Sequence, residues 1–255
     1  MRIRAVVCYD GTKYAGFQRQ VDVLTVQEVL ETALQRVTQA ATSVVAAGRT
    51  DAGVHAAGQV IAFETSWGES VGGLRRAMNA VLPRDVSVLV AEEAAPDFHP
   101  RFDARRRHYR YRIYNGPIRW PLDRRYSLHM PYPLDVEAMN EAGRALVGEH
   151  DFATFGQPPQ GSVTVRRVFR ADWRAESGCR RAFGVGPSGG TWLTFDIEAN
   201  AFLYRMVRSV VGTMLDVGQG RMSIGAFQEA FASRERSQAG KTVAPHGLCL
   251  IRVTY

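Results

Sequence analysis

The stretch Thr25–Gln39, TVQEVLETALQRVTQ, decides how the first hundred residues are organised. Thr25 and Glu28 have the spacing of a capping box, so a helix is expected to begin there. Its apolar residues recur at helical spacing, and they are Val26, Val29, Leu30, Ala33, Leu34 and Val37. The stretch therefore predicts an amphipathic helix that buries one face against a sheet.

Segments that read as strands surround this helix. In chain order the expected elements are a strand at 2–10, the helix at 25–39, strands at 43–47 and 59–65, a helix at 71–82 and a strand at 85–92. A glycine-bearing loop, 48–58, separates the two middle strands. The order is βαββαβ, the split-βαβ or ferredoxin-like unit.

The same order recurs in the second half. The expected elements are a strand at 107–114, a helix at 136–147, strands at 163–174 and 191–199 around a glycine-rich hairpin, a helix at 201–217, an added helix at 224–232 and a strand at 247–254. We expect an α+β protein of two ferredoxin-like domains, 1–102 and 103–255. Their mainly antiparallel sheets are expected to lie side by side, with the functional cleft between them.

Composition sets the class of protein. With 45% apolar and 22% charged residues the chain is globular, and no run of about 18 apolar residues could span a bilayer. The N-terminus reads as a strand and not as a signal peptide. Three scattered cysteines, Cys8, Cys179 and Cys249, form no CxxC pair, which favours a reducing, cytoplasmic setting.

The charge favours a polyanionic partner. The formal net charge is +7, and Lys13 and Lys241 are the only lysines among the 32 basic residues, so 30 are arginines. Arginine binds phosphate in a bidentate manner and stacks on bases. A GC-rich genome would produce the same bias, so the preference alone does not identify the partner.

The loop Gly48–His55, GRTDAGVH, can present one carboxylate, Asp51, two residues after the guanidinium of Arg49. An ordinary Asx-type turn is the alternative. Glycosidases need two carboxylates and metal hydrolases need a ligand cluster. The six histidines show no i,i+4 pair, and no phosphate-binding glycine loop or nucleophile elbow is present. We therefore expect neither a cofactor nor a metal.

Aromatic residues are interleaved with arginines between residues 98 and 112. The stretch Phe98-His99-Pro100-Arg101-Phe102 precedes a strand on which Tyr109 and Tyr111 share one face and Arg110 and Arg112 the other. Rings that stack on bases and arginines that hold phosphates suit single-stranded RNA. A core tyrosine beside a solvated basic face is the alternative.

Two arginines lie near the start of the expected helix 201–217. Arg205 and Arg208 are three residues apart in an otherwise apolar stretch. A buried arginine needs a carboxylate partner, for which Asp51 is a candidate. The alternative is that one or both point to solvent, which we expect of Arg205.

Taken in order, these motifs match a known family. The matching segments are Tyr9–Tyr14, Gly16–Gln20, Thr25–Glu28, Ala47–His55, Phe98–Phe102, Tyr109–Tyr111, Asp151–Phe152, Asn200–Phe202, Met206–Arg208, Ala244–Pro245 and Gly247–Leu248. The chain resembles the tRNA pseudouridine synthase A family over nearly its whole length. It departs from the family pattern in the loop 156–164, which is rich in Gly, Pro and Gln.

The resemblance implies an isomerase, an intramolecular transferase that flips uridines 38, 39 and 40 out of the tRNA anticodon stem-loop and converts them to pseudouridine. It implies a homodimer without cofactor or metal. Asp51 matches the catalytic aspartate and Arg208 the arginine that pairs with it. Arg49 matches an arginine of base flipping, and Tyr109 the tyrosine that stacks on uracil. The stretch Phe98, His99, Pro100, Arg101 and Phe102 matches a tRNA contact.

Isomerisation neither hydrolyses nor oxidises, so a single carboxylate can suffice. Whether Asp51 attacks the sugar or removes its C2′ proton stays open at this point. Two rival functions are a non-catalytic RNA-binding module, suggested by Tyr109 and Tyr111 on a sheet, and a metal-dependent nuclease. The carboxylate in the basic loop argues against the first, and the lack of ligand spacing against the second.

Overall fold

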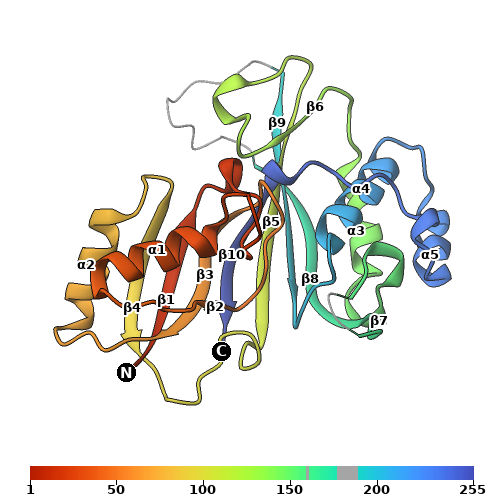
Figure 1. Ribbon diagram of the computed structural model, residues 1–255. Helices are drawn as coiled ribbons and strands as arrows, with labels where there is room; N and C mark the ends of the chain where they lie inside the picture. The colour runs from red at the N-terminus through yellow and green to blue at the C-terminus, as the bar shows by residue number, and fades with distance from the viewer. Residues whose placement is uncertain (159–160, 177–188) are drawn as a thin grey trace. The chain divides into compact units, whose positions relative to one another are not determined.

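The computed structural model describes residues 1–158, 161–176 and 189–255. The described chain is a mixed α+β protein with ten mostly antiparallel strands and five α-helices (Figure 1). It divides into two compact units. The first comprises Met1–Arg107 and Cys249–Tyr255, and the second comprises His108–Leu248.

The first unit is built on a sheet with strand order β4-β1-β3-β10, and β2 pairs with β3. Its elements are β1 (Arg2–Tyr9), the 3₁₀ turn η1 (Gly11–Lys13), α1 (Val26–Thr38), β2 (Val45–Ala46), β3 (His55–Glu64), α2 (Val71–Val81), β4 (Val86–Glu93) and β10 (Leu248–Thr254). β1 runs antiparallel to β3 and β4, whereas β10 runs parallel to β3. The last strand therefore joins the unit that contains the first.

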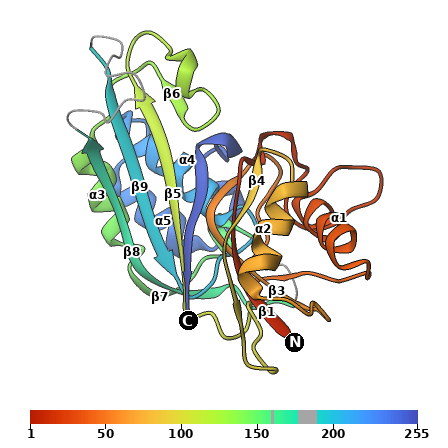
Figure 2. The same ribbon diagram turned by 90° about the vertical axis from the view of Figure 1, so that its left-hand side faces the viewer.

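The helices of this unit form where the pattern predicts them. The Thr25 side chain accepts the backbone N–H of Glu28, at 3.4 Å, which confirms the predicted start of α1. Leu30 and Leu34 on α1 and Leu74 on α2 are fully buried. The helices α1 and α2 lie together on one face of this sheet (Figure 2).

The second unit has strand order β5-β9-β8-β7, with β6 paired to β5. Its elements are β5 (Arg106–Asn115), β6 (Leu128–Met130), α3 (Val136–Arg144), β7 (Gly148–Asp151), β8 (Val165–Glu176), β9 (Thr191–Ala199), α4 (Met206–Gly218) and α5 (Ile224–Ser233). Short 3₁₀ turns lie at Pro121–Asp123, Ala153–Phe155, Arg236–Gln238 and Pro245–Gly247. The strands β6 and β7 were not predicted, because three or four residues give no clear period.

Helix α4 is the central element of the second unit. Val210, Val211 and Met214 are fully buried, and α3 packs on both α4 and β8. A Cβ built on Gly212 would overlap the carbonyl oxygen of Lys241, so the helix lies backbone to backbone against that segment. This close packing is possible because glycine has no side chain.

Some expected boundaries were wrong. The strand expected at 59–65 begins at His55, which shortens the loop 48–58. The helix expected from residue 201 begins at Met206, because Arg205 has a left-handed backbone with φ of 59°. Residues 177–188 of the expected glycine-rich hairpin lie outside the described residues. Within the described ranges, no helix has the length and apolarity needed to cross a membrane.

We predict that Gly212→Ala lowers the free energy of unfolding by about 2 kcal/mol or more, because the added methyl cannot fit beside Lys241. In the control Gly72→Ala on α2, the nearest atom to the new Cβ is an arginine nitrogen at 3.7 Å. That variant should be neutral or gain up to about 1 kcal/mol from better helix propensity. Urea titration of both variants measures the difference, and equal losses would contradict the prediction.

Candidate active site

The loop between β2 and β3 carries Asp51. Its backbone is held by the segment after β1. Phe17 N–H donates to the Thr50 carbonyl at 3.0 Å, and Gly53 N–H donates to the Tyr14 carbonyl at 3.2 Å. Asp51 is half-buried, while its own carbonyl accepts the N–H of Val54 at 3.1 Å. The position of Asp51 is thus set by main-chain bonds.

Two glycines make this close approach possible. A Cβ on Gly11 would overlap the carbonyl oxygen of Val54, and a Cβ on Gly16 would lie 2.8 Å from the carbonyl oxygen of Thr50. Gly16 also has φ of 102°, a conformation that side chains rarely adopt. The pattern of the segment from Tyr9 to Gly16 therefore reflects how tightly it packs on the Asp51 loop.

Side chains secure the same loop from inside the unit. The hydroxyls of Tyr9 and Thr50 are hydrogen bonded at 2.8 Å, and burial raises the pKa of Tyr9 above its ordinary value. Gly11 N–H donates to Nδ1 of the buried His55 at 3.0 Å. The Gln59 amide donates to the Gly48 carbonyl at 2.8 Å. His55 thus helps to hold the segment after β1 against the loop.

Arg49 has a different environment. Its side chain is exposed, between Gly48 and the buried Thr50. Within residues 1–158, 161–176 and 189–255, its guanidinium makes no hydrogen bond or ion pair. Arg49 is therefore available to a ligand.

Arg107 connects the Asp51 loop to the segment after β4. Its guanidinium donates to the carbonyl of Ala47 at 3.0 Å, to that of Ala104 at 3.2 Å and to that of Arg101 at 2.6 Å. Arg107 is buried, and its donors meet the backbone just before Gly48. In the sequence Arg107 is one of several basic residues, and no local pattern indicates that it binds backbone carbonyls.

The stretch 98–102 divides into inward and outward residues. The Phe98 ring packs on Tyr255, with centroids 5.1 Å apart, and Arg4 lies over both rings. Pro100 is buried and its carbonyl accepts the Tyr255 hydroxyl at 2.8 Å. Phe98 and Pro100 thus anchor the stretch to the first unit.

The other three residues form a tip on which Phe102 is exposed and His99 and Arg101 are half-buried. His99 Nδ1 accepts the N–H groups of Arg101 and Phe102 at 3.2 and 3.3 Å. The centroids of the His99 and Phe102 rings lie 4.2 Å apart, and the Arg101 guanidinium carbon lies 5.7 Å from the Phe102 centroid. Phe102 is 75% exposed, so an aromatic face with an arginine beside it is presented to solvent.

In the second unit, Tyr109 lies on β5 and is mostly buried. Its ring makes an edge-on contact with Phe202, with centroids 5.1 Å apart. The adjacent residues His108 and Arg110 both bind the fully buried Asp196: Arg110 donates two bonds, at 2.9 and 3.0 Å, and His108 Nε2 lies 2.5 Å from the carboxylate. The residues on either side of Tyr109 are thus anchored to β9.

The Asp196 carboxylate is ionised in this setting. Burial alone would raise its pKa, but the bonds from His108 and Arg110 outweigh burial and hold the pKa well below its ordinary range. Arg110 was expected on a solvated or RNA-binding face; instead it is half-buried and paired. Its partner is 86 residues away in the chain.

Arg208 lies in the first turn of α4. Its Nε donates to the carbonyl of Val243 at 2.8 Å, and Val243 N–H donates back to the Arg208 carbonyl at 3.3 Å. Tyr111, fully buried on β5, donates to the carbonyl of Ala244 at 2.8 Å. Burial raises the Tyr111 pKa, an effect that the Arg208 charge partly offsets. Arg208 and the 243–247 segment therefore form one cluster.

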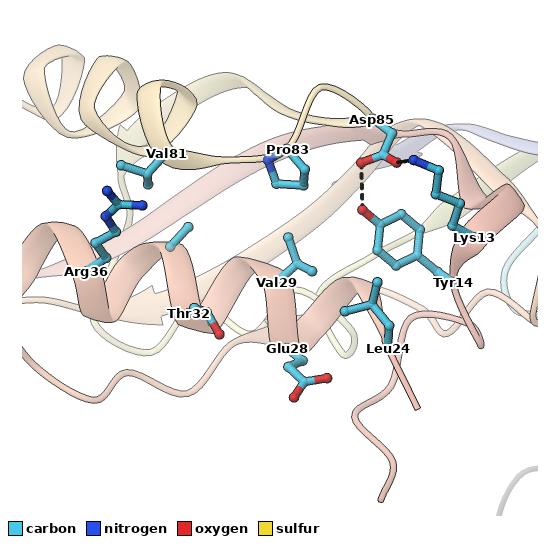
Figure 3. Close-up of a pocket in the computed structure, with 11 residues that line it drawn as sticks. Lys13, Tyr14, Leu24, Glu28, Val29, Thr32, Arg36, Val81, Pro83 and Asp85 are labelled. Carbon is cyan, nitrogen blue, oxygen red and sulfur yellow. Dashed lines mark hydrogen bonds and ion pairs between the residues drawn. The ribbon is translucent and has the colours of Figure 1, made fainter. Parts of the chain in front are cut away.

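A pocket of about 460 Å³ lies between α1, α2 and the segment after β1 (Figure 3). The Tyr14 hydroxyl donates to Asp85 at 2.7 Å, and Lys13 pairs with the same carboxylate at 3.3 Å. None of its lining residues belongs to the 48–55 loop. The pocket is therefore behind the segment that supports Asp51, and it does not contain the candidate catalytic group.

Comparison with known proteins identifies the family. A family described as tRNA pseudouridine synthase matches residues 5–103 and 142–255, most of the chain. The chain belongs to the tRNA pseudouridine synthase family. It is an isomerase that converts uridine to pseudouridine in tRNA. The resemblance inferred from the sequence motifs is confirmed.

Full-length relatives support the same assignment for this synthase. Proteins named tRNA pseudouridine synthase A from Geobacter sp. and Moorella thermoacetica are 40% and 43% identical to it, over 99% of this chain and 98% and 99% of theirs. The protein of that name from Chloroflexus aurantiacus is 44% identical over 99% of this chain and 88% of its own. The similarity thus spans both units of the synthase.

We predict that Gly16→Ala lowers the free energy of unfolding by about 1–3 kcal/mol, because its φ of 102° is strained for alanine and the methyl would press on Thr50. Gly48→Ala is the matched control on the neighbouring loop, with no atom within 4 Å of the new Cβ and no positive φ. Chemical denaturation compares the two. A loss in Gly48→Ala as large as in Gly16→Ala would show that close packing is not the cause.

Proposed function

We propose that this synthase acts on uridines 38, 39 and 40 of the tRNA anticodon stem-loop, with Asp51 as its catalytic residue. The observation that carries the proposal is the placement of Asp51, a half-buried carboxylate on a loop held by main-chain bonds to Tyr14 and Phe17. A group that reacts at one atom of a sugar needs such a fixed position. The motif from Gly48 to His55 supports the same role.

The reaction breaks the N1–C1′ bond, turns the uracil and joins its C5 to C1′. N1 gains a proton and C5 loses one to water, so atoms balance without an added reactant. Asp51 acts at the sugar, as the nucleophile on C1′ or as the base that removes the C2′ proton. A primary kinetic isotope effect with C2′-deuterated uridine would assign the second role.

We assign substrate binding to Tyr109, Arg208 and Arg49. Tyr109 is a ring on a strand whose adjacent residues are anchored to Asp196, which suits stacking on the freed uracil. Arg208 and Arg49 supply guanidinium groups for the flipped nucleotide. Taking a base out of its stack costs a few kcal/mol, about what several phosphate contacts can offset. The free guanidinium of Arg49 suits the space that the base leaves.

The stretch Phe98-His99-Pro100-Arg101-Phe102 is proposed as a tRNA contact. Its tip is the part that suits RNA, because the exposed Phe102 ring lies beside the guanidinium of the half-buried Arg101. Phe98 and Pro100 hold the tip in place from within the unit.

We further propose two ferredoxin-like domains, 1–102 and 103–255. The element order β1-α1-β2-β3-α2-β4 and its antiparallel pairings support this for the first domain. The family resemblance supports a homodimer, which light scattering measures. A cytoplasmic location suits the free thiol of Cys8 and the tRNA substrate.

We predict that Asp51→Asn abolishes turnover and leaves tRNA binding intact, because asparagine keeps the shape and loses the ionised oxygen. C5-tritiated tRNA is incubated with each protein in EDTA, and tritium released to water is measured. The rate should fall by at least about 100-fold. No release by the wild-type protein would refute the proposed function, and normal release by Asp51→Asn would remove Asp51 from the mechanism.

For Tyr109, the ring and the hydroxyl make separable predictions. Tyr109→Phe should keep tRNA binding and most of the stacking, while Tyr109→Leu should weaken binding by roughly 5-fold or more, the lower end of a base–aromatic stack. Filter binding and tritium release measure both variants. Turnover and binding that are indistinguishable among Phe, Leu and wild type would exclude Tyr109 from substrate binding.

A further inference from the structure

The segment between β9 and α4, residues 200–205, has a fixed backbone although it is neither strand nor helix. The Asn200 side-chain oxygen accepts the N–H groups of Arg167 and Ala201 at 3.0 and 2.8 Å. At its other end, Tyr204 N–H donates to the Gln157 carbonyl at 2.9 Å. Side chains on this segment therefore project in directions set by the backbone.

The Tyr204 side chain projects from this segment into solvent. Its neighbours Leu203 and Met206 are buried, whereas Tyr204 is 51% exposed. The Arg205 guanidinium lies 4.8 Å from the Tyr204 ring centroid. In the part of the chain that the structure describes, Arg205 has no carboxylate partner. The result is an exposed ring with an unneutralised cation against it.

The backbone of Arg205 is unusual. Its φ of 59° lies in the left-handed region, where a residue with a side chain is strained and glycine is favoured. The Arg205 side chain forms no cap on α4. Strained positions of this kind are concentrated at functional sites. Here the strain turns Arg205 out beside Tyr204, and no role in the core accounts for the arginine.

This pair lies close to the ring assigned to the uracil. Phe202 contacts Tyr109, with ring centroids 5.1 Å apart. Tyr204 follows Phe202 by two residues in a non-helical stretch, a separation of at most about 7 Å along the backbone. An RNA whose uracil lies on Tyr109 therefore brings its next nucleotides within reach of Tyr204.

We propose that Tyr204, backed by Arg205, stacks a nucleobase adjacent to the target uridine in the bound tRNA. This rests on the proposed role of Tyr109 in holding the uracil. Flipping one base removes a stacking partner from its neighbours. The face of Tyr204 replaces that partner, and it accepts any base because every base has a π-face. Arg205 adds a positive charge for the adjoining phosphate.

The test uses the full-length protein and two anticodon stem-loop RNAs, one with 2-aminopurine at the 5′ neighbour of the target and one with it at the 3′ neighbour. Tyr204→Ala should raise the Kd by about 5- to 150-fold. It should also raise the bound-state fluorescence of one of the two RNAs, because stacking on the ring is lost. Tyr204→Phe should restore both values.

Two further variants separate the parts of the proposal. Arg205→Ala keeps a side chain at the strained position and should reduce the slope of log Kd against log salt by about 1. Tyr132, 64% exposed between β6 and α3, is the matched control, and Tyr132→Ala should leave Kd and fluorescence unchanged.

Several outcomes would overturn the proposal. Equal Kd and fluorescence for Tyr204→Ala and wild type, in both RNAs, would show that no base stacks there. If Tyr204→Ala changes the oligomeric state of the protein and this change accounts for the whole loss of affinity, the Tyr204 ring contacts protein and not RNA. Tritium release by the wild-type protein keeps the two proposals distinct: release with an unaffected Tyr204→Ala removes only the stacking role, and no release removes the proposed function.

Discussion

Two glycines, Gly11 and Gly16, allow the backbone after β1 to lie directly against the loop that carries Asp51. The bonds across this contact join main-chain atoms of Tyr14 and Phe17 to those of Gly53 and Thr50. They do not depend on which rotamers nearby side chains adopt. One of these segments follows β1 and the other leads into β3, and the two strands are paired. The backbone that carries the Asp51 carboxylate is therefore fixed by the sheet.

That contact also explains what sequence reasoning could and could not give. The helix α1 and the alternation of β1 follow from local spacing, and the motif Gly48–His55 marks Asp51 directly. The need for glycine at position 11 does not follow from local spacing, because the atom that excludes a side chain there belongs to Val54, 43 residues later. Periodicity reports faces of an element, and it does not report partners distant in the chain.

The same limit applies to charged residues. Arg107 and Arg110 looked alike in the basic run, yet Arg107 binds backbone carbonyls in the first unit and Arg110 binds the buried Asp196 in the second. The helix α4 was expected from residue 201 because the apolar spacing continues there. The left-handed backbone of Arg205 delays its start by five residues, and nothing in the local pattern predicts that conformation for an arginine.

The pairing of β10 with β3 has a consequence for how the protein matures during synthesis. Residues 249–255 join the first unit, although the whole second unit is translated before them. Until they emerge from the ribosome, β3 keeps an open edge beside His55 and Ala56, and Phe98 lacks the ring of Tyr255. Domains usually fold in the order in which they are translated. Here the first unit is completed only after the second unit has been translated. A strand translated after the whole second unit thus completes the sheet of the first unit.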